Sequence, residues 1–432
     1  MESKTMHRAN VVWTNFCRFA LGIVFIFSGF VKADDPYGMV YKLQDYFVAF
    51  GWTDFMPSFM PLFLSCLLAV FEFTLGVYLF FGIRKRLTSI AVALVMLVMT
   101  PFTLYLAIAN PVSDCGCFGD ALKLTNWETF WKNVVLLVFA LWLFKHYRLV
   151  VKFISKKNQW IISMYGILYS VAIVSYCIFY LPIFDFRPYY IGANIKEQMS
   201  IPEGEEPPVY DTTFILEKDG VQKEFTLDNY PDSTWTFVDS RLHLVKEGYV
   251  PPIADFSLRL YDTGDEVTDL ILSEPGYTFL LISPSLGDAD DGSIDLINEI
   301  YDYSMENGYP FYCVTPSPEE EVEQWKDRTG AEYPYLIGDE TVLKTVVRSN
   351  PGLVLLKEGT IINKWSFQNL PDEYALNGRL EEIPLGQIQQ MPLTHRVGIV
   401  FLWFIVPLAV FTLLDNWYHL YQARKNRRAQ GA

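Results

Sequence analysis

The stretch DCGCFGD, residues 114–120, places Cys115 and Cys117 a single glycine apart. Two thiols at this spacing can form a disulfide, exchange with a partner thiol, or supply half of a metal site. A disulfide across one residue closes a very small ring and should be strained, and strained, exposed disulfides tend to be labile. The pair is therefore a candidate for thiol–disulfide exchange, with a static disulfide clip as the alternative. We expect no metal, because a tetrahedral site takes four ligands and no histidine lies near the motif in the sequence.

The chain around this motif has the composition of a membrane protein. It has 432 residues, of which 51% are hydrophobic and 16% aromatic, both high for a soluble protein. About 20 apolar residues of helix cross a bilayer core. Six stretches approach or reach that length, and we expect transmembrane helices at residues 11–31, 61–81, 89–109, 130–144, 160–181 and 397–414. No small-residue cleavage site follows the first stretch, so we expect no cleavable signal peptide.

The distribution of Lys and Arg between the short loops predicts the orientation. In a six-span arrangement one side collects Lys4, Arg8, Arg84, Lys85, Arg86, Lys145, Arg148, Lys152, Lys156, Lys157, Arg424, Lys425, Arg427 and Arg428. The opposite short loops hold few basic residues, diluted by aspartates. We therefore expect a multi-pass protein of a bacterial-type inner (plasma) membrane with both termini cytoplasmic. The CGC loop and residues 184–394 would then be extracytoplasmic, where disulfides persist.

The charge balance excludes one class of partner. The net charge is −15, and most of the 49 acidic residues fall within residues 184–394. Such an acidic segment would repel phosphates, so we expect no nucleic-acid partner.

Two charged residues fall inside the expected spans. Arg18 lies about two turns into the first and Glu72 near the middle of the second. At ~1.5 Å of rise per residue their depths differ by roughly 6 Å, within reach of an arginine side chain. Because buried charges in a bilayer face a partner or a cavity, we predict that Arg18 and Glu72 form an intramembrane polar pair. The pair would either fix helix packing or serve as a proton relay.

The outer segment has the pattern of an α/β unit. Residues 187–208 are rich in proline and glutamate and are typical of a linker, and a strand-rich stretch follows with an Asp-Gly hairpin turn at residues 219–220. Further along, strands are expected at 277–283 and 310–316, amphipathic helices at 291–308 and 318–330, and a hairpin at 352–365. Strands alternating with helices predict a mixed α/β sheet.

The first four spans resemble the DoxX-like membrane family, and more narrowly its MauE branch. The residues that carry the resemblance are CRFALGIVFIFSGFVK (17–32), EFTLGVYLFFGIRKR (72–86), and DCGCFGD followed by WKN (114–133). The resemblance implies a four-helix membrane module with thiol–disulfide or quinone-linked redox chemistry, carried by Cys115 and Cys117. It is similar in plan to the DsbB and vitamin K epoxide reductase bundles. Those bundles usually use a second cysteine pair, whereas Cys17, Cys66 and Cys177 are isolated here.

The outer unit resembles the thioredoxin-like fold of the membrane-tethered TlpA and ResA branch. The stretch PPIADFSL (251–258) resembles the first strand of that branch, and NPGLVLL places Pro351 where the family carries its cis-proline. Family enzymes carry Cys-x-x-Cys directly after the first core strand. Here that turn reads SPSLGDADDG, beginning Ser283, Pro284, Ser285, and contains no cysteine. The domain is therefore expected to be degenerate and unable to perform dithiol exchange alone.

We thus expect a polytopic α-helical membrane protein with an α/β thioredoxin-like extracytoplasmic domain. The expected parts are a membrane bundle (1–150), a fifth span (151–183), a linker and strand-rich segment (184–250), the thioredoxin-like domain (251–394), and a sixth span with a basic tail (395–432). The expected function is thiol–disulfide exchange with an extracytoplasmic protein through the CGC loop, with a quinone as the implied cofactor and the lipid bilayer as surroundings. The alternative is a non-catalytic scaffold whose outer domain binds a protein or an envelope component.

Overall fold

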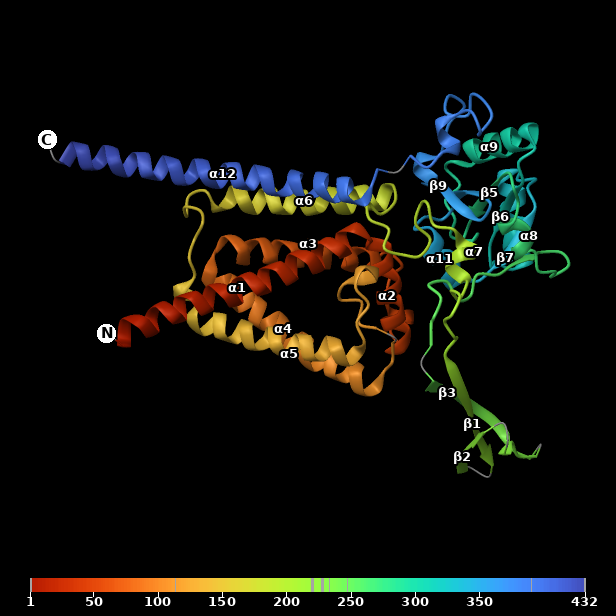
Figure 1. Cartoon of the computed structure of the whole chain (residues 1–432), viewed down its shortest axis with the longest axis horizontal. Helices are drawn as coiled ribbons and strands as arrows, with labels where there is room; N and C mark the ends of the chain where they lie inside the picture. The colour runs from red at the N-terminus through yellow and green to blue at the C-terminus, as the bar shows by residue number, and fades with distance from the viewer. Residues whose placement is uncertain are drawn as a thin grey trace.

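The computed structural model describes residues 2–430 except residues 113, 219–220, 227–228, 233, 247 and 390. A bundle of long helices forms one end of the molecule and a sheet domain forms the other (Figure 1). Both ends of the chain lie at the far end of the helical part, away from the sheet domain (Figure 1). The chain therefore separates into an apolar region and a polar region along one axis.

Within the described residues, six helices are long and apolar enough to cross a membrane. They belong to α1 (Glu2–Asp34), α3 (Met60–Phe81), α4 (Lys85–Ala109), α5 (Asn126–His146), α6 (Gln159–Phe179) and α12 (Leu393–Gln430). This confirms the six spans expected from the sequence. The fourth is longer than its apolar stretch because α5 includes the flanking aromatic and basic residues. The chain is a multi-pass membrane protein.

Helices α1 and α3 pack closely because glycines lie in their interface. A methyl group on Gly29 would lie 2.3 Å from the backbone nitrogen of Phe73, and one on Gly76 would lie 2.5 Å from that of Ile26. Small residues of this kind let transmembrane helices approach each other. Elsewhere, α6 lies beside α12, where the Tyr169 hydroxyl donates to the Val400 carbonyl at 3.0 Å (Figure 1).

Helix α2 (Pro36–Ala49) was not expected from the sequence and lies at the end of the bundle that faces the sheet domain (Figure 1). Its first turn is capped by Asp35, whose carboxylate accepts from the Gly38 amide at 2.8 Å. Proline at the first helical position is favourable there. At 14 residues it is too short to span a bilayer, and it buries Val40, Tyr46 and Phe47 toward the bundle. Short 3-10 helices lie at Thr53–Phe55, Gly119–Ala121, Tyr147–Leu149, Phe367–Asn369 and Pro384–Gly386.

The sheet domain contains a six-stranded mixed sheet of order β4-β7-β6-β5-β8-β9. The strands are β4 (Leu258–Leu260), β5 (Tyr277–Ile282), β6 (Phe311–Val314), β7 (Tyr335–Gly338), β8 (Gly352–Lys357) and β9 (Thr360–Ser366). Strands β5, β6 and β7 are parallel, and the remaining pairings are antiparallel. Every residue of β5 is buried, since both faces of the sheet are covered.

Helices cover the two faces of this sheet. Helices α9 (Ile294–Asn307) and α10 (Glu319–Thr329) share one apolar core with it. Helices α7 (Ile195–Met199), α8 (Thr268–Leu272) and α11 (Glu340–Val346) share the other. The strands and helices expected between residues 277 and 365 are present. Short elements such as β4, α8 and α11 were not predicted, because their hydrophobic pattern covers too few residues to identify a strand or a helix.

The strand-rich stretch forms a separate sheet that projects from the domain (Figure 1). Strands β1 (Val209–Lys218), β2 (Val221–Thr226) and β3 (Thr236–Lys246) are antiparallel in the order β2-β1-β3. The expected Asp-Gly turn lies outside the described residues. The expected linker is shorter than predicted, because α7 and Tyr189 pack into the core of the six-stranded sheet.

Candidate functional site

The CGC motif lies in the loop between α4 and α5. Gly116 has a φ of +65°, a conformation that glycine adopts without steric cost, and its amide donates to the Asp114 carboxylate at 2.8 Å. This turn brings the sulfurs of Cys115 and Cys117 to 2.8 Å from each other. On the far side of the loop, the side chain of Asn126 donates to the Val112 carbonyl at 2.9 Å. The loop is therefore fixed to the start of α5.

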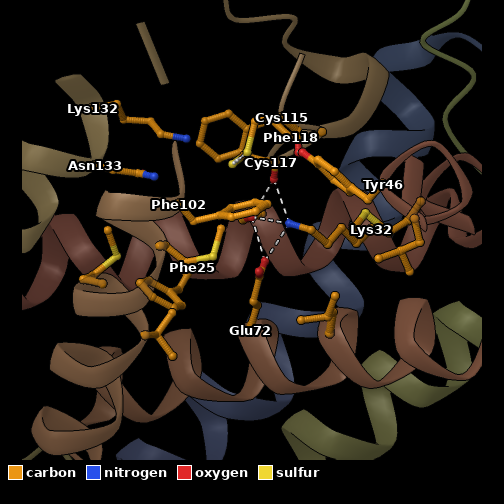
Figure 2. Close-up of a pocket in the computed structure, with 18 of the residues that line it drawn as sticks. Phe25, Lys32, Tyr46, Glu72, Phe102, Cys115, Cys117, Phe118, Lys132 and Asn133 are labelled. Carbon is orange, nitrogen blue, oxygen red and sulfur yellow. Dashed lines mark hydrogen bonds and ion pairs between the residues drawn. The ribbon is translucent and has the colours of Figure 1, made fainter. Parts of the chain in front are cut away.

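The two cysteines line an apolar cavity of about 600 Å³, whose other lining residues come mainly from α1 to α5 and the CGC loop. Aromatic side chains dominate its walls, among them Phe25, Tyr46, Phe47, Phe50, Phe102 and Phe118. Figure 2 shows Lys132 and Asn133 pointing into the cavity from α5 and Lys32 reaching it from α1. The Lys132 ammonium lies 4.1 Å from the centre of the Phe118 ring. The site thus combines two neighbouring thiols, an apolar cavity and two cationic side chains.

Lys32 occupies the centre of a buried polar network. Its ammonium lies 2.8 Å from each of the Glu72 carboxylate, the Ser28 hydroxyl and the Cys117 carbonyl (Figure 2). The Ser28 hydroxyl is also 2.7 Å from the Glu72 carboxylate and 2.7 Å from the same carbonyl. All three ammonium protons of Lys32 therefore have an acceptor, which offsets the burial of a side chain only 5% exposed. The network attaches the CGC loop to α1 and α3.

The surroundings give the two thiols different acidities. A hydrogen bond from the Cys115 thiol and the nearby charges of Lys132 and Lys32 lower the pKa of Cys117, against the opposing effects of burial and of the Glu72 carboxylate. Donating that hydrogen bond, together with burial, raises the pKa of Cys115. In the reduced pair Cys117 is therefore the more acidic of the two thiols, and the thiolate is the reactive form of cysteine.

The predicted Arg18–Glu72 pair is wrong. Arg18 lies beside Gly82. A methyl group added to Gly82 would lie 2.9 Å from the Arg18 guanidinium. Gly82 is ten residues beyond Glu72 in the same helical segment, or roughly 15 Å. Arg18 donates to the Val151 carbonyl and lies 4.3 Å from the centre of the Phe19 ring. The prediction from the sequence failed because it estimated the depth of each residue in the membrane by counting from the ends of its helix. The glycine contacts between α1 and α3 instead fix how the two helices are aligned, and they place Lys32 beside Glu72.

The residues singled out in the outer domain lie together where β5 ends. The Ser283 hydroxyl donates to the side-chain oxygen of Asn350 at 2.7 Å, and the Asn350 amide donates to the Ser285 carbonyl at 2.8 Å. The peptide bond between Asn350 and Pro351 is cis, and Pro284 lies between the two serines. A serine–asparagine hydrogen-bond set therefore holds this turn. Cys313 is fully buried in β6, and burial raises the pKa of its thiol.

The sheet domain contacts the CGC loop through Arg348. Arg348, just before the cis-proline, forms ion pairs with Asp35 at 2.9 Å and with Asp120 at 3.1 Å. Its side chain is only 6% exposed. A second cavity, of about 510 Å³ and bordered by α2, the CGC loop and α11, lies beside this contact; we call it the outer cleft. Lys32 and Gly116 line both cavities, so they form part of the wall between them.

Several of these residues were not assigned a role from the sequence. Ser28, Lys32 and Lys132 lie within stretches that carry the family resemblance, SGFVK and WKN, which is the signal that could have identified them. Arg348 has no such signal. Among the described residues, no group of three or more His, Cys, Asp and Glu side chains is placed to hold a metal ion.

Comparisons with known families agree with the membrane part. Residues 9–146 match the family described as methylamine utilisation protein MauE, a region that includes α2 to α5, most of α1 and both cysteines of the motif. Residues 210–247 match a domain of unknown function, DUF8463, over the projecting three-stranded sheet. No similar curated protein and no similar solved structure were found.

Proposed function

We propose, from the similarity of residues 9–146 to MauE and the chemistry of the paired cysteines, that this is a membrane thiol–disulfide redox protein. The observation that carries the proposal is the placement of the pair. The two sulfurs lie 2.8 Å apart on the wall of a 600 Å³ apolar cavity inside the bundle. Structural disulfides do not need such a chamber, whereas a pair that passes electrons to an apolar acceptor does.

The acidity of the two thiols assigns their roles. The thiol with the lower pKa is the better leaving group. A partner thiolate therefore attacks the Cys115 sulfur, forms a mixed disulfide and releases Cys117 as a thiolate that Lys132 and Lys32 stabilise. The second partner thiolate then attacks the mixed disulfide, which leaves the partner oxidised and the pair reduced. The reverse sequence would reduce a partner.

A lipid-soluble quinone, implied by the resemblance to redox bundles, fits the cavity. Its volume is in the range of sites for drug-sized ligands, ~300–1,000 Å³, and its walls are apolar and aromatic. Lys132 and Asn133 would supply hydrogen bonds to a carbonyl oxygen at one end. When bound, such a molecule would provide a sink for two electrons close to the cysteine pair.

The outer domain is proposed to be a degenerate thioredoxin-like domain in an extracytoplasmic compartment. The order of its elements and the cis-proline beside the Ser283 turn support the fold. The clustering of basic residues in loops near the two termini supports an arrangement with both termini inside. A reporter enzyme fused after Ile388 should be active only outside the inner membrane, and a fusion at the C-terminus only in the cytoplasm. The opposite result would contradict this topology and the redox function with it.

Thiol trapping in intact cells tests the proposed function. We expect acid-quenched, alkylated samples to show both dithiol and disulfide forms of the pair, shifting with added reductant. Cys117→Ser should accumulate a partner linked to Cys115, and Cys115→Ser should accumulate little. A pair that is always oxidised, resists mild reductant and traps no partner in either variant would identify a static clip.

A second candidate is a non-catalytic membrane scaffold. It is favoured by the turn at residues 283–292, which has serines where dithiol enzymes have cysteines. The Arg348 ion pairs would then hold the outer domain in position as a docking surface for a protein or an envelope component. The trapping experiment separates the two functions.

A further inference from the structure

We propose that Lys32 and Glu72 carry protons between the outer cleft and the Cys115–Cys117 pair. The inference rests on the proposed redox function and adds a role that disulfide exchange alone does not assign. Lys32 is the residue that joins the two cavities chemically, because it lines both and carries a titratable group. Its ammonium contacts the Glu72 carboxylate and the Cys117 carbonyl, both at 2.8 Å.

The chemistry of the exchange requires such a path. When a partner dithiol reduces the pair, the Cys115–Cys117 S–S bond breaks and a partner S–S bond forms. Two electrons move to the pair, and the partner releases its two thiol protons on the water side. Cys115, whose pKa is raised, takes up a proton at neutral pH, and Cys117 can remain a thiolate. The proton for Cys115 must therefore enter a site whose walls are apolar.

The burial of the ion pair supports a functional role. Lys32 and Glu72 lie near the outer end and the middle of their spans, with side chains 5% and 17% exposed. Ionisable groups at such positions are costly, and in membrane proteins they mark ion pathways and proton relays. A network that only fastened the loop could use neutral side chains. Here an acid and a base are in direct contact, which is the arrangement that passes a proton on.

Other charged groups face this site, and their influence on the rate must be distinguished from that of Lys32 and Glu72. From α5, the Lys132 ammonium lies over the Phe118 ring, and from α2 the Tyr46 hydroxyl donates to the Cys115 carbonyl at 3.0 Å. In the outer cleft, Lys42 pairs with Asp114 at 2.8 Å. Arg348 pairs with Asp35 at 2.9 Å and with Asp120 at 3.1 Å, and Asp120 also pairs with the exposed Lys123 at 3.6 Å. None of these groups contacts the Glu72 carboxylate in the interactions described.

Kinetics of disulfide reduction test the proposal on the full chain in lipid nanodiscs. The oxidised pair is reduced with dithiothreitol between pH 5.5 and 8, and the reaction is followed by acid quenching and alkylation. The position of the redox equilibrium is measured in the same samples. We expect Glu72→Gln to slow the reduction by about 100-fold, the usual scale of lost acid–base catalysis, with little change in the equilibrium. Glu72→Asp should keep most of the rate, and added formate should restore the rate of Glu72→Gln.

Matched controls remove a charge from the outer cleft without touching the network. Lys123→Met and Asp45→Asn alter exposed residues of the cleft and should leave the rate unchanged. If Glu72→Gln is as fast as the wild type, or if its rate and equilibrium change together without rescue by formate, the proton path is wrong and the network is structural.

A second measurement does not depend on the variants folding. In the wild type, reduction in D₂O should be slowed more than reduction of a free peptide with the sequence DCGCFGD. An equal isotope effect would overturn the proton path alone. A wild-type pair that dithiothreitol cannot reduce at all would overturn the proposed function and the path together.

Discussion

At the scale of single residues, the proposed exchange depends on a difference in acidity between two thiols that are one residue apart in the sequence. The sulfurs of Cys115 and Cys117 share one hydrogen bond; the charge of Lys132 lowers the pKa of both thiols, and the charge of Lys32 also lowers that of Cys117. A symmetric dithiol would have no preferred leaving group. This asymmetry makes the direction of attack a testable property.

The pH dependence of alkylation tests this asymmetry. In the reduced protein, the reaction of Cys117 with iodoacetamide should rise at a pH below the ordinary thiol pKa, because its lowered pKa makes the thiolate form at lower pH. Cys115 should stay unreactive over the neutral range. Cys115→Ala removes the donated hydrogen bond and should move the rise to higher pH, whereas Cys115→Ser keeps a donor and should shift it less. A rise near the ordinary thiol pKa of ~8.5 in the wild type would contradict the assignment.

A double-mutant cycle tests the partner of Glu72. Lys32→Met and Glu72→Gln should each reduce the free energy of unfolding by ~3–5 kcal/mol, because each leaves a buried charge without a partner. The double variant should lose clearly less than the sum. Arg18→Met combined with Glu72→Gln is the control, and its effects should add within ~0.5 kcal/mol, since the two sites are far apart. Coupling of Arg18 instead of Lys32 would show that the register of α1 against α3 is different.

At the scale of elements, the contact between α1 and α3 decides which polar residues meet. Gly29 allows the two backbones to touch, so Ser28 and Lys32 come to lie beside Glu72. The cavity is lined by α1 to α5 and the CGC loop, and α2 lies at the end of the bundle that faces the sheet domain (Figure 1).

Gly29→Ala tests the close approach. The added methyl group would fall 2.3 Å from the Phe73 backbone, which a side-chain movement cannot relieve. We expect a loss of ~1–3 kcal/mol of unfolding free energy and a weaker Lys32–Glu72 contact. Gly398→Ala, in α12 with open space around it, is the control and should be neutral or stabilising by up to ~1 kcal/mol. Equal effects of the two substitutions, measured by denaturation in mild detergent, would rule out the packing argument.

At the scale of the whole molecule, the outer domain and the membrane bundle meet at the CGC loop. Arg348 provides this contact from the sheet domain, and the ion pairs of Lys364 and Arg187 with Asp185 fix the segment that leaves α6. The sheet domain therefore lies where it can limit access to the CGC loop.

Hydrogen exchange tests this contact between the two parts. Arg348→Met should increase amide exchange in the CGC loop and in α11, because it removes both ion pairs to the loop and to the α1–α2 junction. The change should be confined to these two segments. Arg379→Met, which removes an exposed ion pair of the same domain, should change neither. Unchanged exchange in Arg348→Met would indicate that the remaining contacts hold the domain in place.

The sequence by itself determined the features that depend on local composition. The six spans follow from runs of apolar residues, and β5, α9, β6, α10 and the β8–β9 hairpin follow from period and from turn residues such as Gly308. The CGC pair was identifiable because its two members are adjacent in the chain. In each case the interacting residues are close in sequence, so no tertiary information was required.

Only the tertiary structure decided which distant residues surround the pair. The partner of Glu72 depends on helix register, which is set by backbone contacts at two glycines and not by depth counted along each helix. The cavity needs five helices to close, and the Arg348–Asp35 ion pair joins residues 313 positions apart. Helix α2 is short and weakly periodic, and its burial comes from neighbours that the sequence does not specify. Contacts of this kind are fixed by packing, because many sequences with the same local pattern could meet in other registers.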